Sequence, residues 1–230
     1  MAVYDCFIFN DELDLLDIRF QELGNVVDRF VIVEATKTFS GKPKPLYLRD
    51  NLNRFLPILG KLTHVMVDDF PNTNNPWDIE RHQRNCILRG LEQCKGTDII
   101  AISDCDEIIS REVFTPYTPF NDIQALEMDM YYYDMHTKGD DKWYFAKIAP
   151  CITVRQMQPH GIRNAAKYGI ITNAGRHLSF FGGVDAIIKK IESFSHQEYN
   201  TPEFKNRVRI QTAIDQGVDL FGRGIQFKKV

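Results

Sequence analysis

Residues 98–108 read DIIAISDCDEI, and this stretch decides which fold the chain is expected to adopt. Its first half is a short apolar run of strand length, and two carboxylates, Asp104 and Asp106, follow at once. An uninterrupted apolar run is typical of a strand that a parallel sheet buries on both faces. We therefore predict a buried strand over residues 98–103, with the acidic pair just past its carboxyl end.

The chain before this strand alternates between strand and helix patterns. Apolar runs predict strands at 3–9, 28–36 and 63–70, and helical spacing or flanking turn signals predict helices at 10–23, 51–59 and 77–93. Strands that alternate with helices favour a parallel, open α/β sheet with right-handed crossovers. The first half of the chain is therefore expected to form a Rossmann-like sheet with flanking helices.

The second half has a different pattern and predicts a smaller, mixed region. Residues 123–135 are expected to form one or two strands, and 143–157 a strand pair broken at Pro150. Residues 161–182 are expected to be rich in loops, and helices are expected at 185–194 and 207–217. Since nothing marks a linker or a repeat, we expect a single domain over residues 1–230.

Composition limits the classes of function. The 230 residues are 43% hydrophobic and 26% charged, which is typical of one globular domain. A net charge of −3 lacks the excess of positive charge that is typical of proteins that bind nucleic acid or an anionic membrane surface. The five cysteines lack metal-knuckle spacing, which favours a reduced intracellular setting. We see no signal peptide and no apolar run long enough to span a bilayer, so a cytoplasmic location is expected.

The acidic pair at the end of the fourth strand predicts a metal site. Ligands of open α/β sheets bind outside the carboxyl ends of the strands. Asp104 and Asp106 would repel each other there unless a cation neutralised them. A hard divalent cation takes oxygen ligands and completes its shell with substrate phosphates. The alternative interpretation is a solvated acidic turn that caps the next helix.

A basic helix face precedes the acidic strand. Arg81 and Arg84 are three residues apart and share one face of the predicted helix 77–93. Arginine suits bidentate recognition of phosphate. The two side chains are therefore candidates for binding a diphosphate beside the metal, and a solvated basic face is the alternative.

Two histidine-containing segments are further candidates. His196 follows the helix 185–194, and a neutral imidazole could complete the metal shell. His177 and Ser179 alternate with apolar residues between glycine-containing turns, where the backbone can approach a ligand closely. The alternatives are a capping or surface histidine at 196 and a sheet corner at 173–183.

Together these segments resemble glycosyltransferase family 17, which includes the β-1,4-N-acetylglucosaminyltransferase that adds bisecting GlcNAc. The resemblance rests on an ordered set of motifs that covers almost the full length of the chain. They are YDCFIFNDELDLLDIRFQEL, VDRFVIVEATKTFSGKPKPL, ERHQRNCILRGL, DIIAISDCDEI, AGRHLSFFGG and KIESFSHQEYN. The resemblance implies a GT-A-type fold, an inverting reaction, a UDP-sugar donor with GlcNAc as the expected sugar, and Mn²⁺ or Mg²⁺.

The resemblance also implies site residues. Asp104 and Asp106 match the family's D-x-D motif for metal and diphosphate, with His196 as a third ligand. Residues 1–110 would form the nucleotide-sugar half and 111–230 the acceptor half, which binds a carbohydrate. His177 and Ser179 should face the sugar or the acceptor. The remaining residues expected to border the nucleotide sugar are Phe9, Asn10, Glu12, Glu34, Thr36, Arg81 and Arg84.

Two points depart from the family or stay open. The family often has Trp where this chain has Arg176, which would remove a sugar-stacking surface and affects the expected acceptor. The family's Golgi enzymes carry a membrane anchor that this sequence lacks, which suggests a bacterial or viral type of enzyme. Inversion requires a base, for which the candidates are Asp185, Glu198 and Glu127.

Two other functions compete with glycosyl transfer. Haloacid-dehalogenase-like phosphatases also place D-x-D after a buried strand, but near the N-terminus and followed by Thr or Val rather than by Glu107 and Ile108. They would hydrolyse simple phosphomonoesters. A non-catalytic protein that binds nucleotide sugars or glycans is the third possibility, and it would release no UDP from a donor.

Overall fold

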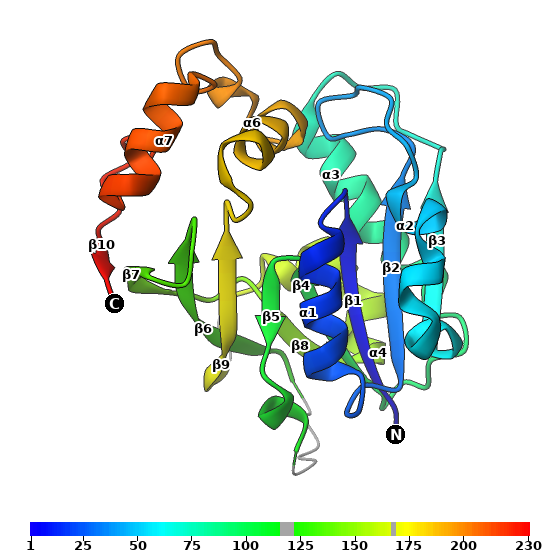
Figure 1. The fold of residues 1–230 in the computed structure, drawn as a ribbon. Coiled ribbons are helices and arrows are strands. Elements are labelled where there is room, and N and C mark those ends of the chain that lie inside the picture. Colours follow the sequence, from blue (N-terminus) through cyan, green and yellow to red (C-terminus); the bar gives the residue numbers. More distant parts are fainter. Residues whose placement is uncertain (116–121, 167–168) are drawn as a thin grey trace.

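The computed structural model describes residues 1–115, 122–166 and 169–230. Within these ranges the strands form one ten-stranded sheet, in which eight follow the order β10-β7-β6-β8-β4-β1-β2-β3 while β5 and β9 pair off this path (Figure 1). The strands are β1 Val3–Phe9, β2 Arg29–Ala35, β3 Leu62–Val67, β4 Ile99–Asp104, β5 Glu107–Ile109, β6 Gln124–Tyr132, β7 Thr137–Trp143, β8 Lys147–Pro150, β9 Gly169–Ser179 and β10 Phe227–Lys229. The α-helices are α1 Leu13–Leu23, α2 Tyr47–Asp50, α3 Pro76–Asn85, α4 Cys151–Met157, α5 Pro159–Arg163, α6 Gly183–Ser193 and α7 Arg207–Gln216. The 3₁₀ helices are η1 Leu52–Lys61, η2 Cys86–Gly90, η3 Arg111–Phe114 and η4 Gln197–Tyr199.

The first four strands form the parallel part of the sheet, as the sequence predicts. β1 pairs in parallel with β2 on one side and with β4 on the other, and β2 pairs in parallel with β3. The chain therefore builds outward from β1 to β3 and then crosses back to place β4 on the other side of β1. The carboxyl ends of β1 and β4 form a topological switch point, where open α/β sheets bind ligands.

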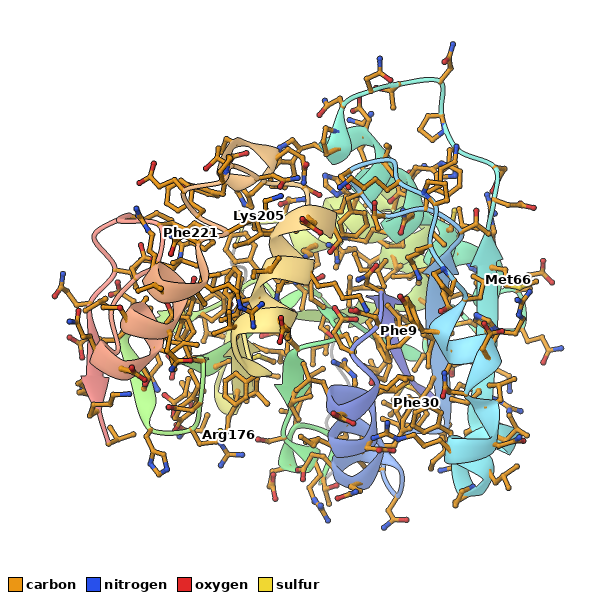
Figure 2. The ribbon with its side chains drawn as sticks, turned by 45° about the horizontal axis from the view of Figure 1, so that its top comes forward. Phe9, Phe30, Met66, Arg176, Lys205 and Phe221 are labelled. Carbon is orange, nitrogen blue, oxygen red and sulfur yellow. The ribbon has the colours of Figure 1, made fainter. Side chains whose placement is uncertain are left out.

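β1 shows why these strands need apolar residues along their whole length. All seven of its residues are buried. Phe7 and Phe9 belong to the core layer that contains Leu16 and Phe20 of α1, whereas Cys6 and Ile8 belong to the layer on the other face. Figure 2 labels Phe9 and Phe30 in the first of these layers, beside α1. The central strands are thus covered on both faces, which fixes their position.

The second half is mixed, as predicted. β8 runs antiparallel to β4 and β6, and β6 runs antiparallel to β7 and parallel to β9. A third apolar cluster joins β6 to α6 and α7, with Tyr132, Ile187, Ile191 and Ile210 at its centre. Helices α6 and α7 form at the predicted positions, and they lie above this part of the sheet in Figure 1.

The predicted strand pair at 143–157 is wrong in its second member. β8 ends at Pro150, and the next residues form helix α4 instead of a strand. Pro150 is the last residue of β8 that pairs with β4, and it is also the N-cap of α4. No intrahelical hydrogen bond needs an N–H at the start of a helix, so proline is tolerated there. The buried residues Cys151 and Val154 are three apart, which is helical spacing that the apolar run concealed.

The loop-rich prediction for 161–182 is also wrong. Residues 169–179 form the eleven-residue strand β9, which pairs with β5 on one side and β6 on the other. Its exposed and buried side chains do not alternate strictly, so period-two alternation gives a weak signal. Backbone pairing with two strands that are distant in sequence stabilises β9 instead. Similarly, the predicted helix 77–93 is shorter, because α3 ends at Asn85 and a 3₁₀ turn follows.

Candidate active site

A cavity of about 1210 Å³ lies at the switch point. The segments after β1, β2 and β4, helices α3 and α6, and the β7–β8 connection all contribute to its wall. Both halves of the chain therefore build one cavity. Its charged and aromatic lining residues include Phe9, Asp11, Glu12, Phe39, Trp77, Glu80, Arg81, Arg84, Asp104, Asp106, Trp143, Phe145, His160, Arg163, Lys189, Lys190 and His196.

Arg19 shapes the turn that carries the acidic pair. Its side chain is fully buried, and its Nε and Nη2 atoms donate to Asp5 at 2.6 and 2.5 Å. Its Nη1 donates to the backbone oxygens of Asp104 and Glu107, each at 2.9 Å. The buried ion pair of Arg19 with Asp5 therefore fixes the backbone of the turn after β4. The sequence-predicted site did not include this ion pair. Its signal in the sequence was a charged residue in each of two apolar patterns, Asp5 in the strand 3–9 and Arg19 in the helix 10–23.

Asp104 lies between two arginines. Arg84 Nη1 donates to its Oδ1 at 2.7 Å, and Arg163 Nη2 donates to its Oδ2 at 2.5 Å. Burial by itself would raise the pKa of Asp104, but the charges of Arg163 and Arg84 outweigh burial and lower it. The side chain keeps 32% of its surface exposed, and Asp104 lines the cavity. Asp104 is thus held ionised at the edge of the cavity.

Glu107 supports the arrangement from inside the protein. It is fully buried, and both of its oxygens accept from Arg163 at 2.8 Å. It also accepts from the backbone N–H of Asp104 at 2.8 Å and from the indole N–H of Trp143. Burial would lower the pKa of Arg163, but Asp104 and Glu107 raise it, so the guanidinium stays charged. Arg163 belongs to the short helix α5, and sequence analysis missed it because nothing in its own segment marks it.

Asp106 faces the C-terminal half of the chain. Lys190 Nζ of α6 donates to Asp106 Oδ2 at 2.7 Å, and His177 Nε2 lies 3.6 Å from its Oδ1. Burial would raise the pKa of Asp106, but Lys190 and then His177 lower it. Lys190, which sequence analysis also missed, is one of several charged residues on an amphipathic helix and has no distinctive pattern of its own.

The predicted nucleotide-binding residues fall into two groups. Phe9, Asn10 and Glu12 line the cavity, as does Arg84. Glu34 does not line it: the Glu34 carboxylate accepts the N–H of Leu48 at 2.8 Å and lies 3.0 Å from His64 Nε2, so it fixes the start of α2. Thr36 is also absent from the lining, and its N–H donates to Val67. Arg81 lines the cavity but pairs with Asp78, and more than half of its side chain is exposed.

His177 and Ser179 are buried behind the cavity wall and are not among its lining residues. The His177 ring packs against Trp143, with ring centroids 4.4 Å apart. Arg176, next to it on β9, lines a different, smaller pocket together with Ile18 and Glu22 and is not a lining residue of the large cavity. Figure 2 labels Arg176. The Trp-to-Arg departure therefore does not change the wall of the large cavity.

His196 lines the cavity, and its ring packs edge-on against Trp77, with centroids 4.6 Å apart. Its Nδ1 lies 2.6 Å from Glu198 Oε1. Across residues 1–115, 122–166 and 169–230, no group of three or more His, Cys, Asp or Glu side chains is arranged to hold a metal ion. The structure thus brings Asp104 and Asp106 to one cavity and places His196 in its wall without gathering all three.

The candidate bases lie away from the acidic pair. The Asp185 side chain is 83% exposed, pairs with Arg207 at 2.6 Å, and does not line the cavity. Glu198 is also absent from the lining, and its Oε1 lies at hydrogen-bond distance from Nδ1 of the lining residue His196. Glu127 accepts from the hydroxyl of Tyr144 at 3.0 Å on the outer part of β6 and is likewise not a lining residue.

Comparisons with known proteins agree with the motifs. The model of glycosyltransferase family 17 matches residues 1–223. The chain is 36% identical over 118 residues to the rat β-1,4-mannosyl-glycoprotein 4-β-N-acetylglucosaminyltransferase, and 37% identical over 111 residues to the human enzyme of that name. These matches cover 48% and 45% of this chain but only 22% and 21% of the two enzymes.

A solved structure was also found, that of the mannosyltransferase PcManGT from Pyrobaculum calidifontis in complex with GDP-Man and Mn²⁺. Its TM-score is 0.46 at 11% identity, with 93% of this chain and 69% of that chain covered. In the described part of the chain, no helix has the length and apolar character needed to cross a membrane.

Proposed function

The chain belongs to glycosyltransferase family 17, and we propose that it moves a sugar from a nucleotide diphosphate sugar to a hydroxyl group of a carbohydrate. The observation that carries this proposal is the charged cluster at the switch point. Asp104 and Asp106 face one cavity, and Arg84, Arg163 and Lys190 surround them. Such a cluster can bind a diphosphate and stabilise the charge that grows on it as the sugar leaves.

The nucleotide would occupy the cavity beside β1 and β2. Phe9 ends β1 and Asn10 follows it, Lys37 and Thr38 follow β2, and all four line the cavity. This is the edge of the sheet at which open α/β folds bind nucleotides. The donor class proposed is a UDP-sugar, and GlcNAc is the proposed sugar because the curated relatives are named N-acetylglucosaminyltransferases.

The residues present fit a divalent cation. The lowered pKa values of Asp104 and Asp106 keep both carboxylates ionised, and both face the cavity. Asp106 Oδ1 lies 3.6 Å from His177 Nε2, which is longer than a hydrogen bond. Mg²⁺-like ions are commonly held by one or two carboxylates plus substrate phosphates. Asp104 and Asp106 would therefore hold Mn²⁺ or Mg²⁺ together with the donor diphosphate.

His196 is the proposed third ligand. Its Nδ1 lies at hydrogen-bond distance from Glu198, which leaves Nε2 for a partner in the cavity. Histidines that bind metals commonly donate their other N–H to a carboxylate, which fixes the tautomer. Glu198 would thus act by orienting His196 rather than by touching substrate.

The cation would stabilise the negative charge on the leaving diphosphate. The protein's own part is to position the same group: Arg84 and Arg163 fix Asp104, and the Lys190 ammonium bonds to Asp106. Inversion also needs a base that reaches the acceptor hydroxyl. Because Asp185 does not line the cavity, we propose that the base comes from the side chains that do.

Thermal-shift measurements test the donor and the metal together. The protein would be heated with UDP, UDP-GlcNAc or GDP-mannose, each with and without Mn²⁺. A ligand at 100 times its Kd stabilises the folded state by about 2.7 kcal/mol, which raises the Tm of a chain of this size by roughly 5–10 °C. We expect such a shift for the UDP compounds when Mn²⁺ is present.

The competing functions give different results in the same preparation. Turnover of p-nitrophenyl phosphate would indicate a phosphatase, and donor binding without UDP release on addition of glycans would indicate a non-catalytic binding protein. If no nucleotide compound shifts the Tm at any Mn²⁺ concentration, the proposed function is wrong.

A further inference from the structure

The exposed aromatic side chains are concentrated in the cavity. Trp77 and Phe145 are the two most exposed aromatic side chains among residues 1–115, 122–166 and 169–230, and each leaves 45% of its surface uncovered. Both line the large cavity. Aromatic rings that a protein leaves uncovered in a polar site are available to stack on a ligand.

Phe145 packs among the residues that hold Asp104. Its ring packs on Trp143, with centroids 4.8 Å apart, and Trp143 packs in turn on His177. The indole N–H of Trp143 bonds to the buried carboxylate of Glu107, so the stack cannot rotate freely. The guanidinium of Arg163, which bonds to Asp104, lies 5.5 Å from the Phe145 ring centroid. The ring is thus preorganised one side chain away from the proposed diphosphate site.

The two aromatic residues belong to different sides of the switch point. Trp77 lies in the first turn of helix α3, which packs on β1 and β2, and its ring packs against His196. Phe145 precedes β8, whose residue Lys147 pairs with Ile102 near the carboxyl end of β4. Phe145 therefore lies just before the strand that pairs with β4, and β4 ends in Asp104.

On the premise of the proposed function, we propose that Phe145 is the surface on which a pyranose ring of the substrate stacks. The faces of a pyranose that carry axial C–H groups are apolar and weakly positive, which suits the negative face of an aromatic ring. The hydroxyl groups at the rim of the sugar need polar partners, and Asn164 and His160 line the cavity on this side. The ring could belong to the donor or to the acceptor.

The test uses three variants of the full chain. Phe145→Ala removes the ring, Phe145→Tyr keeps it, and Ile152→Ala is the matched control. Ile152 is an apolar side chain on α4 that is 55% exposed and does not line the cavity. Calorimetry would measure the affinity for UDP and for UDP-GlcNAc with Mn²⁺, and an array of immobilised mannose-, galactose- and GlcNAc-terminated glycans would measure acceptor binding.

Each source of the pyranose predicts its own result. If Phe145 stacks on the donor sugar, Phe145→Ala weakens UDP-GlcNAc binding about tenfold and leaves UDP binding unchanged. If it stacks on the acceptor, both donor affinities stay the same and the glycan signal falls about tenfold. In either case Phe145→Tyr and Ile152→Ala behave like the wild type.

Unchanged affinity of Phe145→Ala for UDP-GlcNAc and for the array would overturn this inference. A loss of UDP affinity equal to the loss of UDP-GlcNAc affinity would also overturn it, because the ring would then act on the nucleotide. A wild-type chain that binds neither UDP nor UDP-GlcNAc would instead contradict the proposed function, and the glycan array would still report on Phe145.

Discussion

Asp104 and Asp106 are two residues apart, but they have different partners. Asp104 is bound by arginines from α3 and α5, whereas Asp106 is bound by a lysine from α6. Ionised groups with little exposure need such partners, because an unpaired buried charge is strongly destabilising. The same cations that stabilise the ligand-free cluster are placed to meet a phosphate. The two carboxylates should therefore be necessary for donor binding, and replacing either one should also lower the stability of the fold, because its basic partners lose a counter-charge.

Asn substitutions test the acidic pair directly. Asp104→Asn or Asp106→Asn removes one of the two charges proposed to hold the cation, and we expect transfer activity to fall at least about 100-fold. Asp185→Asn is the control, because that side chain is exposed and lies outside the cavity, and it should retain activity. Activity would be followed by UDP release. An inactive Asp185→Asn protein with normal donor binding would restore Asp185 as a candidate base.

Arg163 should be the most sensitive of the basic residues for stability. Arg163→Met leaves Glu107 buried without its main partner, and breaking a buried pair typically costs about 3–5 kcal/mol. Arg111→Met is the matched control, since Arg111 forms a half-exposed pair with Glu22 and should lose no more than about 1 kcal/mol. Urea unfolding measures both. Similar losses for the two variants would contradict the role assigned to Arg163.

At the scale of the elements, burial on both faces explains which predictions succeeded. β1, β2 and β4 are mostly apolar because core layers cover both sides of the sheet, so the sequence alone predicts them. β9 has no such pattern, and its place depends on pairing with β5 and β6, more than forty residues earlier in the chain. No local pattern can report a partner at that distance.

Gly175 of β9 gives this pairing a test. Its φ is +154°, and a Cβ atom there would lie 2.2 Å from the backbone oxygen of Ile108 in β5. Gly175→Ala must therefore push β5 away, at a cost of about 1–3 kcal/mol, and should weaken donor binding because β5 begins at Glu107. Gly60→Ala is the control, since a Cβ atom at Gly60 meets no atom within 4 Å. Equal stability of the two variants by urea unfolding would show that β9 tolerates a side chain.

At the scale of the whole molecule, the site is assembled from both halves of the chain. Asp104 and Asp106 could be placed from the sequence because they follow an apolar strand directly. Arg163, Lys190 and Phe145 could not, because they lie on elements whose approach to β4 depends on the complete topology. Residues 111–230 therefore supply charged groups to the acidic pair that follows β4, so the site does not divide at residue 110.

This assembly predicts that the chain unfolds as one unit. The main apolar cluster contains Phe7, Phe20 and Phe30 of the first half together with Met128 and Ile148 of the second, so this cluster couples the two halves. The two tryptophans report on the halves separately, because Trp77 lies in α3 and Trp143 ends β7.

The single-tryptophan variants Trp77→Phe and Trp143→Phe would be unfolded in urea, and each would be followed by its fluorescence and by its own circular dichroism. Trp143→Phe loses the hydrogen bond to Glu107 and should unfold at lower urea concentration. The fluorescence curve is compared with the circular dichroism curve of the same variant, so the lower stability of Trp143→Phe does not affect the comparison. Coincident transitions within each variant are expected of a two-state domain. If fluorescence and circular dichroism separate in either variant, the halves at 1–110 and 111–230 fold as distinct units and the shared core does not couple them.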